Sequence, residues 1–189
     1  MSKKEEKLEK LDIKLFEKLH IKQKNEVKLL QSICFTKVSE EEAREDFYHP
    51  ELAQVLVYAG EKLIAWAGIH ETEQKFQGKK IKIGGYGICT HPDWQRQGIA
   101  KKVSKRAMDF LKKREVEIGF LSIDPLNKVS VKLHQKNGFV MLPRKFSWTN
   151  SKGELKTDFG GMIAPINSEK LFEYVLHGSE IFYVGNGYW

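Results

Sequence analysis

The sequence has little of what marks a secreted, membrane-spanning or metal-binding protein. Its 189 residues include only two cysteines, Cys34 and Cys89, too few for a disulfide framework. No run of 18 apolar residues occurs, so we expect no membrane span. The charged start of the chain lacks the apolar core of a signal peptide, which makes a cytoplasmic location the default expectation. There is no internal repeat and no Cys/His cluster with metal-ligand spacing, and we expect no bound metal.

Composition and length predict one globular domain with an excess of positive charge. Hydrophobic residues make up 41% of the chain, enough for a sizeable core. We place a single domain at residues 11–189, after a highly charged and frayed segment at 1–10. The net charge of +7 suits either nucleic acid or a polyanionic cofactor. Since no groove-reading motif occurs and basic helix faces are usually solvated, we expect no nucleic-acid partner.

Hydrophobic periodicity predicts strands first and then an alternation of strands and helices. Residues 52–58 and 63–70 are typical of a hairpin, and residues 11–15 fit either a strand or a helix. Further strands are expected at 81–88, 118–123, 139–142 and 161–166, and helices after Gly98, at 128–137 and at 168–176. This order predicts an α+β fold, an α/β mixed sheet with helices on both faces. We expect each of the two strand–helix units to run parallel to its neighbour.

One stretch, from Ile88 to Ala100, joins the end of a strand to the start of a helix. Pro92 ends the strand because proline cannot donate to a ladder, and apolar residues recur at helical spacing after Gly98. A helix start has unpaired N–H groups and the positive end of the dipole, so it suits an anion such as a pyrophosphate. The alternative is an ordinary strand–helix connection in which Gly98 serves packing alone.

Two motifs stand together in the second half of the chain. They are Thr90-His91-Pro92 with Gln95-Arg96-Gln97-Gly98-Ile99-Ala100, and Asn127 with Ser130, His134 and Gly138-Phe139. The joint pattern resembles the GCN5-related N-acetyltransferase (GNAT) superfamily, which implies an acyl-CoA N-acyltransferase fold and acetyl-CoA as cosubstrate. It implies that the pyrophosphate lies on Gln95, Arg96, Gln97, Gly98, Ile99, Ala100 and Lys101, and the pantetheine arm on Ile88, Cys89, Thr90, Asn127 and Ser130.

The same resemblance suggests catalytic residues, with two departures from the family's pattern. His134 stands where the family usually has a tyrosine, and we predict that its imidazolium protonates the leaving thiolate of CoA. A pKa of about 6.5 would give an alkaline limb in the pH profile; the alternative is a surface histidine without a catalytic part. Tyr86 replaces a strand carboxylate, which leaves Glu71 and Glu73 as candidate bases or as solvated carboxylates. Cys89 is expected to be a buried structural thiol.

From residues 54–67 to the final Trp189 the chain is also similar to aminoglycoside 2′-N-acetyltransferases, although the acidic residue expected shortly before that tryptophan is absent. The similarity implies that Asp158 and the Trp189 carboxylate meet a cationic acceptor, in an acceptor-side extension at 145–189. The leading prediction is direct transfer of acetyl from acetyl-CoA to a primary amine of a small molecule. The alternatives are an aminoglycoside, a protein amine, or a CoA-binding regulatory module without turnover. A homodimer is left open.

Overall fold

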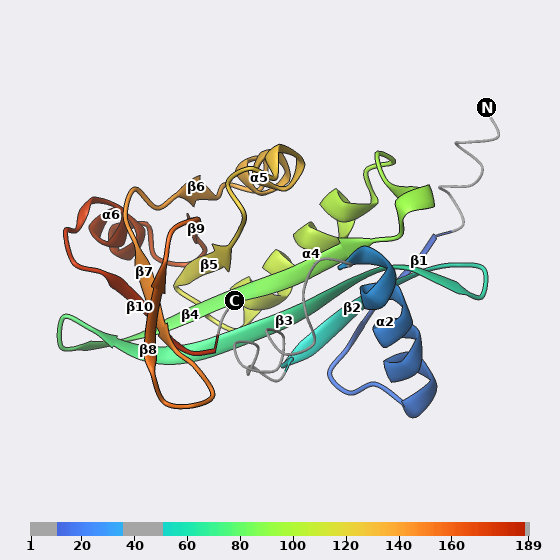
Figure 1. The fold of residues 1–189 in the computed structure, drawn as a ribbon, viewed down its shortest axis with the longest axis horizontal. Helices are drawn as coiled ribbons and strands as arrows, with labels where there is room; N and C mark the ends of the chain where they lie inside the picture. Colours follow the sequence, from blue (N-terminus) through green and yellow to red (C-terminus); the bar gives the residue numbers. More distant parts are fainter. Residues whose placement is uncertain (1–10, 36–50, 188–189) are drawn as a thin grey trace.

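The computed structural model describes residues 11–35 and 51–187 (Figure 1). The predicted frayed start at 1–10 and the terminal Trp189 lie outside these residues. The elements in chain order are β1 Leu11–Phe16, α2 Ile21–Cys34, β2 Ala53–Ala59, β3 Lys62–Phe76, β4 Lys79–Thr90, the short 3-10 helix η1 Pro92–Trp94, α4 Ile99–Lys113, β5 Ile118–Ser122, α5 Lys128–Gln135, β6 Val140–Met141, β7 Phe146–Thr149, β8 Leu155–Asp158, β9 Gly161–Pro165, α6 Glu169–His177 and β10 Phe182–Asn186. The segment that fitted a strand or a helix is thus the strand β1.

A seven-stranded mixed sheet with the order β1-β2-β3-β4-β5-β9-β6 runs through the fold. Strands β1 to β4 are antiparallel neighbours. The chain then crosses through α4 and returns as β5, which pairs in parallel with β4. The predicted mixed sheet and the first predicted parallel strand–helix unit are confirmed.

The second strand–helix unit departs from the prediction. Strands β5 and β6 are joined by α5, yet β9 lies between them and pairs antiparallel with both. Met162, Ile163 and Ala164 of β9 are at most 1% exposed, which suits a central strand covered on both faces. Strand β6 has only two residues and leaves Val140 38% exposed, which suits an edge. Strands β5 and β6 are therefore not paired with each other, so the second unit has no parallel partner in the strand that follows it.

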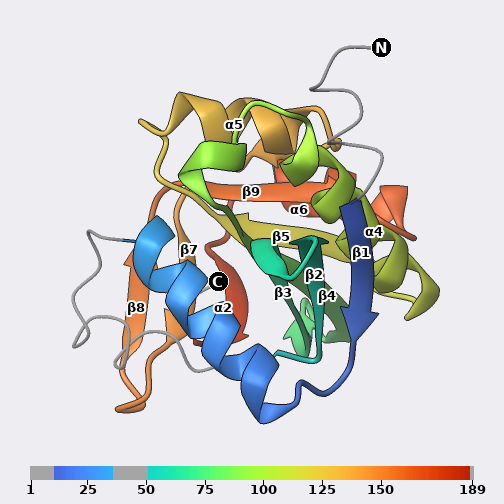
Figure 2. The same ribbon diagram turned by 90° about the vertical axis from the view of Figure 1, so that its right-hand side faces the viewer.

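Helices cover both faces of the sheet, as predicted (Figure 2). In β2, Val55 and Val57 join the core under α4, and Leu56 between them joins the core under α2, because successive strand residues face opposite sides. Helix α4 turns Val103 and Leu111 to the first of these cores. Among the described residues, none of the helices has the length and apolar character needed to cross a membrane.

A three-stranded second sheet, in the order β10-β7-β8, packs on the α2 side of the main sheet. Phe146 and Trp148 of β7 and Phe182 of β10 share a core with Ile83 of β4, which lies on the same face of that strand as Cys89 under α2. The sequence does not predict the β7–β8 hairpin, because all residues of β8 are exposed and show no apolar alternation. The C-terminal segment 182–186 forms β10, and its apolar residues Phe182 and Val184 pack over the main sheet.

Candidate active site

Strands β4 and β5 separate after two residue pairs. They are joined at Ile83–Ile118 and Gly84–Gly119, and in the described chain no later residues of these strands pair with each other. Figure 1 shows the two strands diverging beyond this point. We call the region between residues 85–90 of β4 and 120–122 of β5 the wedge. Backbone groups on the facing edges are available to an extended ligand, as in strand addition.

The loop before α4 is held in shape by its own side chains. Trp94 is 8% exposed and anchors the loop in the core under α4. Gln95 donates from Nε2 to the Thr90 carbonyl at 3.2 Å, and Gln97 donates from Nε2 to the Asp93 carbonyl at 3.3 Å. Two side chains predicted to meet the cofactor therefore shape the loop, and what the loop offers to a ligand is mainly its backbone amides.

Helix α4 begins with amides that no side chain of its own N-cap closes. The N-cap is Gly98, with a left-handed φ of +76°, and the Lys102 amide is the first to bond back, to the Gly98 carbonyl at 3.2 Å. Arg96 is also left-handed, with φ +58°, a conformation that costs a non-glycine residue about 1 kcal/mol or more. The first turn, which lies wholly within the described chain, has no acidic residue. Such a helix start is an anion site.

Open space and an orphaned polar atom mark where a ligand fits. A Cβ on Gly98 would meet no atom within 4 Å, so the approach to the helix start is clear. The Thr90 hydroxyl oxygen at the end of β4 is buried and has no hydrogen-bond partner in the described part of the chain. Ile99 is 1% exposed, so its side chain belongs to the core and only its amide faces outward. A chain of polar groups ending in a pyrophosphate fits these features.

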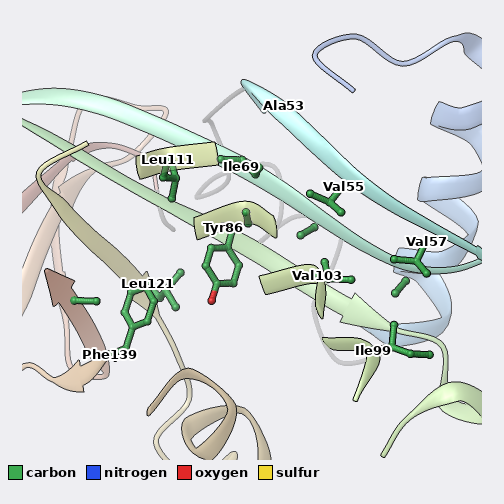
Figure 3. Packing of buried hydrophobic residues seen from close by; sticks show 14 of the residues in the cluster. Ala53, Val55, Val57, Ile69, Tyr86, Ile99, Val103, Leu111, Leu121 and Phe139 are labelled. Carbon is green, nitrogen blue, oxygen red and sulfur yellow. The ribbon is translucent and has the colours of Figure 1, made fainter. Parts of the chain in front are cut away.

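A buried pair of polar rings lies beside the wedge. Tyr86 projects from β4 and His134 from α5; each is 4% exposed, and the Tyr86 hydroxyl lies 3.2 Å from His134 Nδ1. Figure 3 shows the Tyr86 oxygen pointing away from β4 toward the side of Leu121 and Phe139. Burial raises the pKa of Tyr86 to about 12 and lowers the pKa of His134 to about 4. Both rings are therefore uncharged at neutral pH.

This environment changes the role predicted for His134. A histidine whose pKa is about 4 is neutral in almost every molecule at pH 7, so the imidazolium predicted from the sequence is not the form present. A pKa of about 4 does not support the predicted alkaline limb near neutral pH for this group. The alternative of a surface histidine is wrong, because the side chain is buried.

Two further polar side chains continue the network from the rings to α4. Asn137 donates from Nδ2 to Ser104 Oγ at 2.8 Å, and Ser104 donates to the Lys101 carbonyl at 3.2 Å. The polar side chains of Asn137 and Ser104 beside the Tyr86 oxygen offset part of the rise in its pKa caused by burial. Sequence reasoning missed both residues. The available signal was Ser104, a polar residue inside the apolar stripe of the helix.

Asn127 and Ser130 together close the start of α5. The Asn127 side chain accepts a hydrogen bond from the Ser130 amide at 3.1 Å and so caps the helix. The oxygen of the Asn127 amide is therefore already used, and its Nδ2 is the group that remains for a ligand. Asn127 is exposed and Ser130 is half-buried at this helix start.

Ile88 and Cys89 face opposite sides near the end of β4. Cys89 packs with Leu30 and Trp66 under α2, and burial raises the pKa of its thiol far above the ordinary value. The thiol therefore stays protonated and agrees with the expected structural role. Ile88 packs against the core under α4. Both residues use their side chains for packing, so backbone groups are what they can offer a ligand in the wedge.

The two candidate bases are held in ion pairs. Arg114 bonds both carboxylate oxygens of Glu71, at 2.6 and 2.7 Å. Lys80 pairs with Glu73, and this hydrogen-bonded ammonium lowers the pKa of the carboxyl. The Arg114 guanidinium occupies both oxygens of Glu71, and the lowered pKa makes Glu73 a weaker base, so neither carboxylate is suited to take a proton from an amine. The structure thus favours the alternative in which both lack a catalytic part.

Of the two predicted acceptor residues, one lies in the second sheet and the other lies outside the described residues. Asp158 ends β8 and is exposed, and its Oδ1 accepts a hydrogen bond from the Phe159 amide at 2.7 Å. Trp189 lies outside the described residues. On the α2 face, Trp66 of β3 donates from Nε1 to Gln54 at 2.8 Å.

The diverging central strands and the uncapped helix start are features that suit a protein with a long anionic cofactor. The model of the acetyltransferase (GNAT) family matches residues 24–139, more than half of the sequence, and the chain belongs to this family. It is a GNAT-type N-acetyltransferase with acetyl-CoA as cosubstrate, which confirms the resemblance read from the two motifs. Comparison with curated protein sequences finds no match.

Solved structures share the fold at low sequence identity. The ribosomal-protein-S18-alanine N-acetyltransferase of Escherichia coli is 17% identical with a TM-score of 0.55, and the match covers 84% of this chain and 98% of that one. A GNAT-family acetyltransferase of Streptococcus pneumoniae is 14% identical with a TM-score of 0.55, over 82% and 100% of the two chains. An aminoglycoside acetyltransferase from an uncultured soil metagenomic sample is 16% identical with a TM-score of 0.52, over 68% and 87%. The predicted fold class is confirmed.

Proposed function

We propose that the protein transfers the acetyl group of acetyl-CoA directly to a primary amine of a small molecule. The observation that carries this proposal is the uncapped start of α4 at Gly98, next to the free edge of β4. The amides of residues 95–101 would hold the pyrophosphate, and Arg96 and Lys101 add positive charge there.

The pantetheine arm would run along β4, paired with backbone groups of Ile88, Cys89 and Thr90. The orphaned Thr90 hydroxyl gives the arm one further partner. From the side of β5, the Asn127 Nδ2 and the Ser130 hydroxyl at the start of α5 would complete the contacts.

In the reaction the amine nitrogen attacks the thioester carbonyl. A C–N bond forms, the C–S bond breaks, sulfur leaves with the electron pair as thiolate, and the new amide nitrogen gives up one proton to water. Because Glu71 and Glu73 are ion-paired, the amine has to arrive uncharged, and the rate rises with pH as the free amine deprotonates. Holding a neutral amine against the thioester supplies much of the catalysis.

We place the acceptor on the face of the sheet away from α4. Helix α2 covers one end of this face and the second sheet lies toward the other (Figure 1). Residues 145–189 are then the acceptor-side extension, and the exposed carboxylate of Asp158 is the group we expect a cationic acceptor to meet. A cytoplasmic location and a homodimer stay predictions.

An aminoglycoside is the second candidate acceptor. The exposed carboxylate at the end of β8 favours it, because such a group attracts a polycationic sugar. The soil acetyltransferase that resembles this chain was solved with sisomicin as well as with trehalose. A protein amine is the third, since the similar Escherichia coli enzyme is named for the alanine of a ribosomal protein.

A thiol-release assay separates these functions. The full chain is incubated with acetyl-CoA and, in turn, an alkyl monoamine, a polyamine, an aminoglycoside and a peptide with a free N-terminus. Release with a small amine supports the proposal, and release with the peptide alone contradicts it. Binding of CoA without release from any amine points instead to a regulatory module.

Gly98→Val tests the cofactor site. Valine at φ +76° strains the loop and fills the clear approach to the helix start, so we expect CoA affinity to fall at least tenfold by calorimetry. Gly60→Val is the matched control, because Gly60 has φ +62°, has equally open surroundings and lies in the β2–β3 turn. Equal loss of affinity in both variants would show that strain, not the anion site, is responsible.

A further inference from the structure

The buried rings of Tyr86 and His134 form a unit that the family match does not explain. One residue comes from β4 and the other from α5, and their polar atoms meet at 3.2 Å where both side chains are shielded from water. We propose that Tyr86 is a positioning residue: it holds His134 as a neutral donor whose Nε2–H hydrogen-bonds the sulfur leaving from acetyl-CoA. This inference rests on the proposed function.

The hydrogen-bond partners decide which nitrogen carries the hydrogen. A neutral imidazole has one donor and one acceptor nitrogen. The Ser104 hydrogen goes to the Lys101 carbonyl, and Asn137 gives one amide hydrogen to Ser104 and has a second for the Tyr86 oxygen. With that oxygen accepting from Asn137, the phenol hydrogen points to His134 Nδ1. The imidazole hydrogen is then on Nε2, directed away from Tyr86.

No charged group disturbs this arrangement within the described chain. The residues that face His134 are the Tyr86 phenol from β4 and the Phe139 ring next to β6, both uncharged. The lowering of its pKa has burial as its sole cause. Burial likewise keeps the phenol protonated by raising its pKa. The pair thus keeps one protonation state throughout the range in which acetyl transfer would be assayed.

Position along β4 brings the pair to the reacting end of the cofactor. Tyr86 precedes Thr90 by four residues, which is about 13 Å of extended strand. An arm that starts at the α4 amides and lies along the free edge of β4 therefore ends beside these rings. As the C–S bond breaks, the developing thiolate gains a fixed donor in a dry site, leaves with its electron pair, and takes a proton from water after release.

Nitrogen NMR on the full chain tests the positioning without any acceptor. In protein labelled with 15N-histidine, long-range proton–nitrogen couplings distinguish the two neutral tautomers, and His134→Gln assigns the signal. We expect the Nε2–H tautomer alone from pH 6 to 9, and a mixture of both tautomers in Tyr86→Phe. A dominant Nδ1–H tautomer or an imidazolium at pH 7 in the unsubstituted protein would overturn the inference.

Steady-state kinetics with the amine found by thiol release tests the consequence. Tyr86→Phe should lower kcat about tenfold, the value of one net hydrogen bond, with KM for acetyl-CoA unchanged. His134→Phe should lower kcat about 10²-fold, whereas His134→Gln, which keeps a neutral donor, should recover most of that loss with the same pH profile. The matched control is Tyr58→Phe, which removes a phenol bonded to Glu26 instead.

Full kcat in Tyr86→Phe, or equal losses in His134→Phe and His134→Gln, would contradict the positioning role. Failure of the proposed function looks different. In that case the unsubstituted protein does not bind CoA or does not release thiol, while the NMR result still decides whether Tyr86 fixes the tautomer.

Discussion

Helices α4 and α5 follow the two strands of the wedge, and they contribute to it in different ways. Helix α4 offers its end, because Gly98 has no side chain and the amides of the first turn stay available to an anion. Helix α5 offers its side, because Asn127 closes its first turn and His134 reaches Tyr86 from its buried face. The residue at the N-cap therefore decides whether the amides of the first turn stay free for a ligand or are bonded by the cap side chain.

The largest expected effect concerns the buried side of α5. The pKa of His134 is about 4 in the folded chain and about 6.5 in an unfolded one, so the unfolded state takes up a proton first as the pH falls. Stability is then complete above pH 6.5 and decreases by up to about 3 kcal/mol as the pH falls to 4. Urea unfolding at pH 7 and 4.5 measures the loss. His134→Gln should lose less, and an equal loss would show that other groups dominate acid unfolding.

The end of α4 should respond to a cap of its own. Asparagine and aspartate both tolerate a left-handed φ and can bond the free amides, but only aspartate adds a charge. We expect Gly98→Asp to bind CoA about tenfold more weakly than Gly98→Asn, since the carboxylate repels the pyrophosphate in the same place. Calorimetry at low and high salt checks this. A difference that does not shrink with salt would argue against an electrostatic cause.

The start of α5 should show the smallest effect, divided between stability and binding. Asn127→Ala removes the cap and should cost about 1 kcal/mol in urea unfolding. Asn127→Ser keeps a capping oxygen but loses Nδ2, so we expect stability near that of the unsubstituted protein and CoA affinity lowered about threefold. If the serine variant binds CoA fully, Asn127 serves the helix alone.

The parts of the site that could be predicted are those determined by one short segment of the sequence. Gly98 stands between an apolar strand and an apolar helical stripe, and Asn127 precedes the next stripe, so both helix starts follow from local chemistry. The Tyr86–His134 contact joins residues 48 positions apart and depends on how α5 settles on β4. Nothing in the local sequence shows that burial moves the pKa of His134 out of the neutral range.

The fold was predictable to a similar extent. Buried strands such as β2 and β5 are apolar runs, which can be recognised directly in the sequence. Strand β8 is exposed along its whole length and gives no such signal. Strand β9 lies between β5 and β6 because it is apolar on both faces and can be buried as a central strand. This pairing depends on residues far apart in the chain, so the local sequence does not predict it.

That place of β9 also sets an order of assembly. During synthesis the chain completes β5, α5 and β6 before residues 161–165 exist, yet β6 is joined to the main sheet through β9. Until then the nascent chain carries an open edge on β5, and closing it is a non-local step of the kind that slows folding and invites mispairing. The sheet beside the wedge is therefore finished late, once the C-terminal part of the chain has left the ribosome and inserted β9.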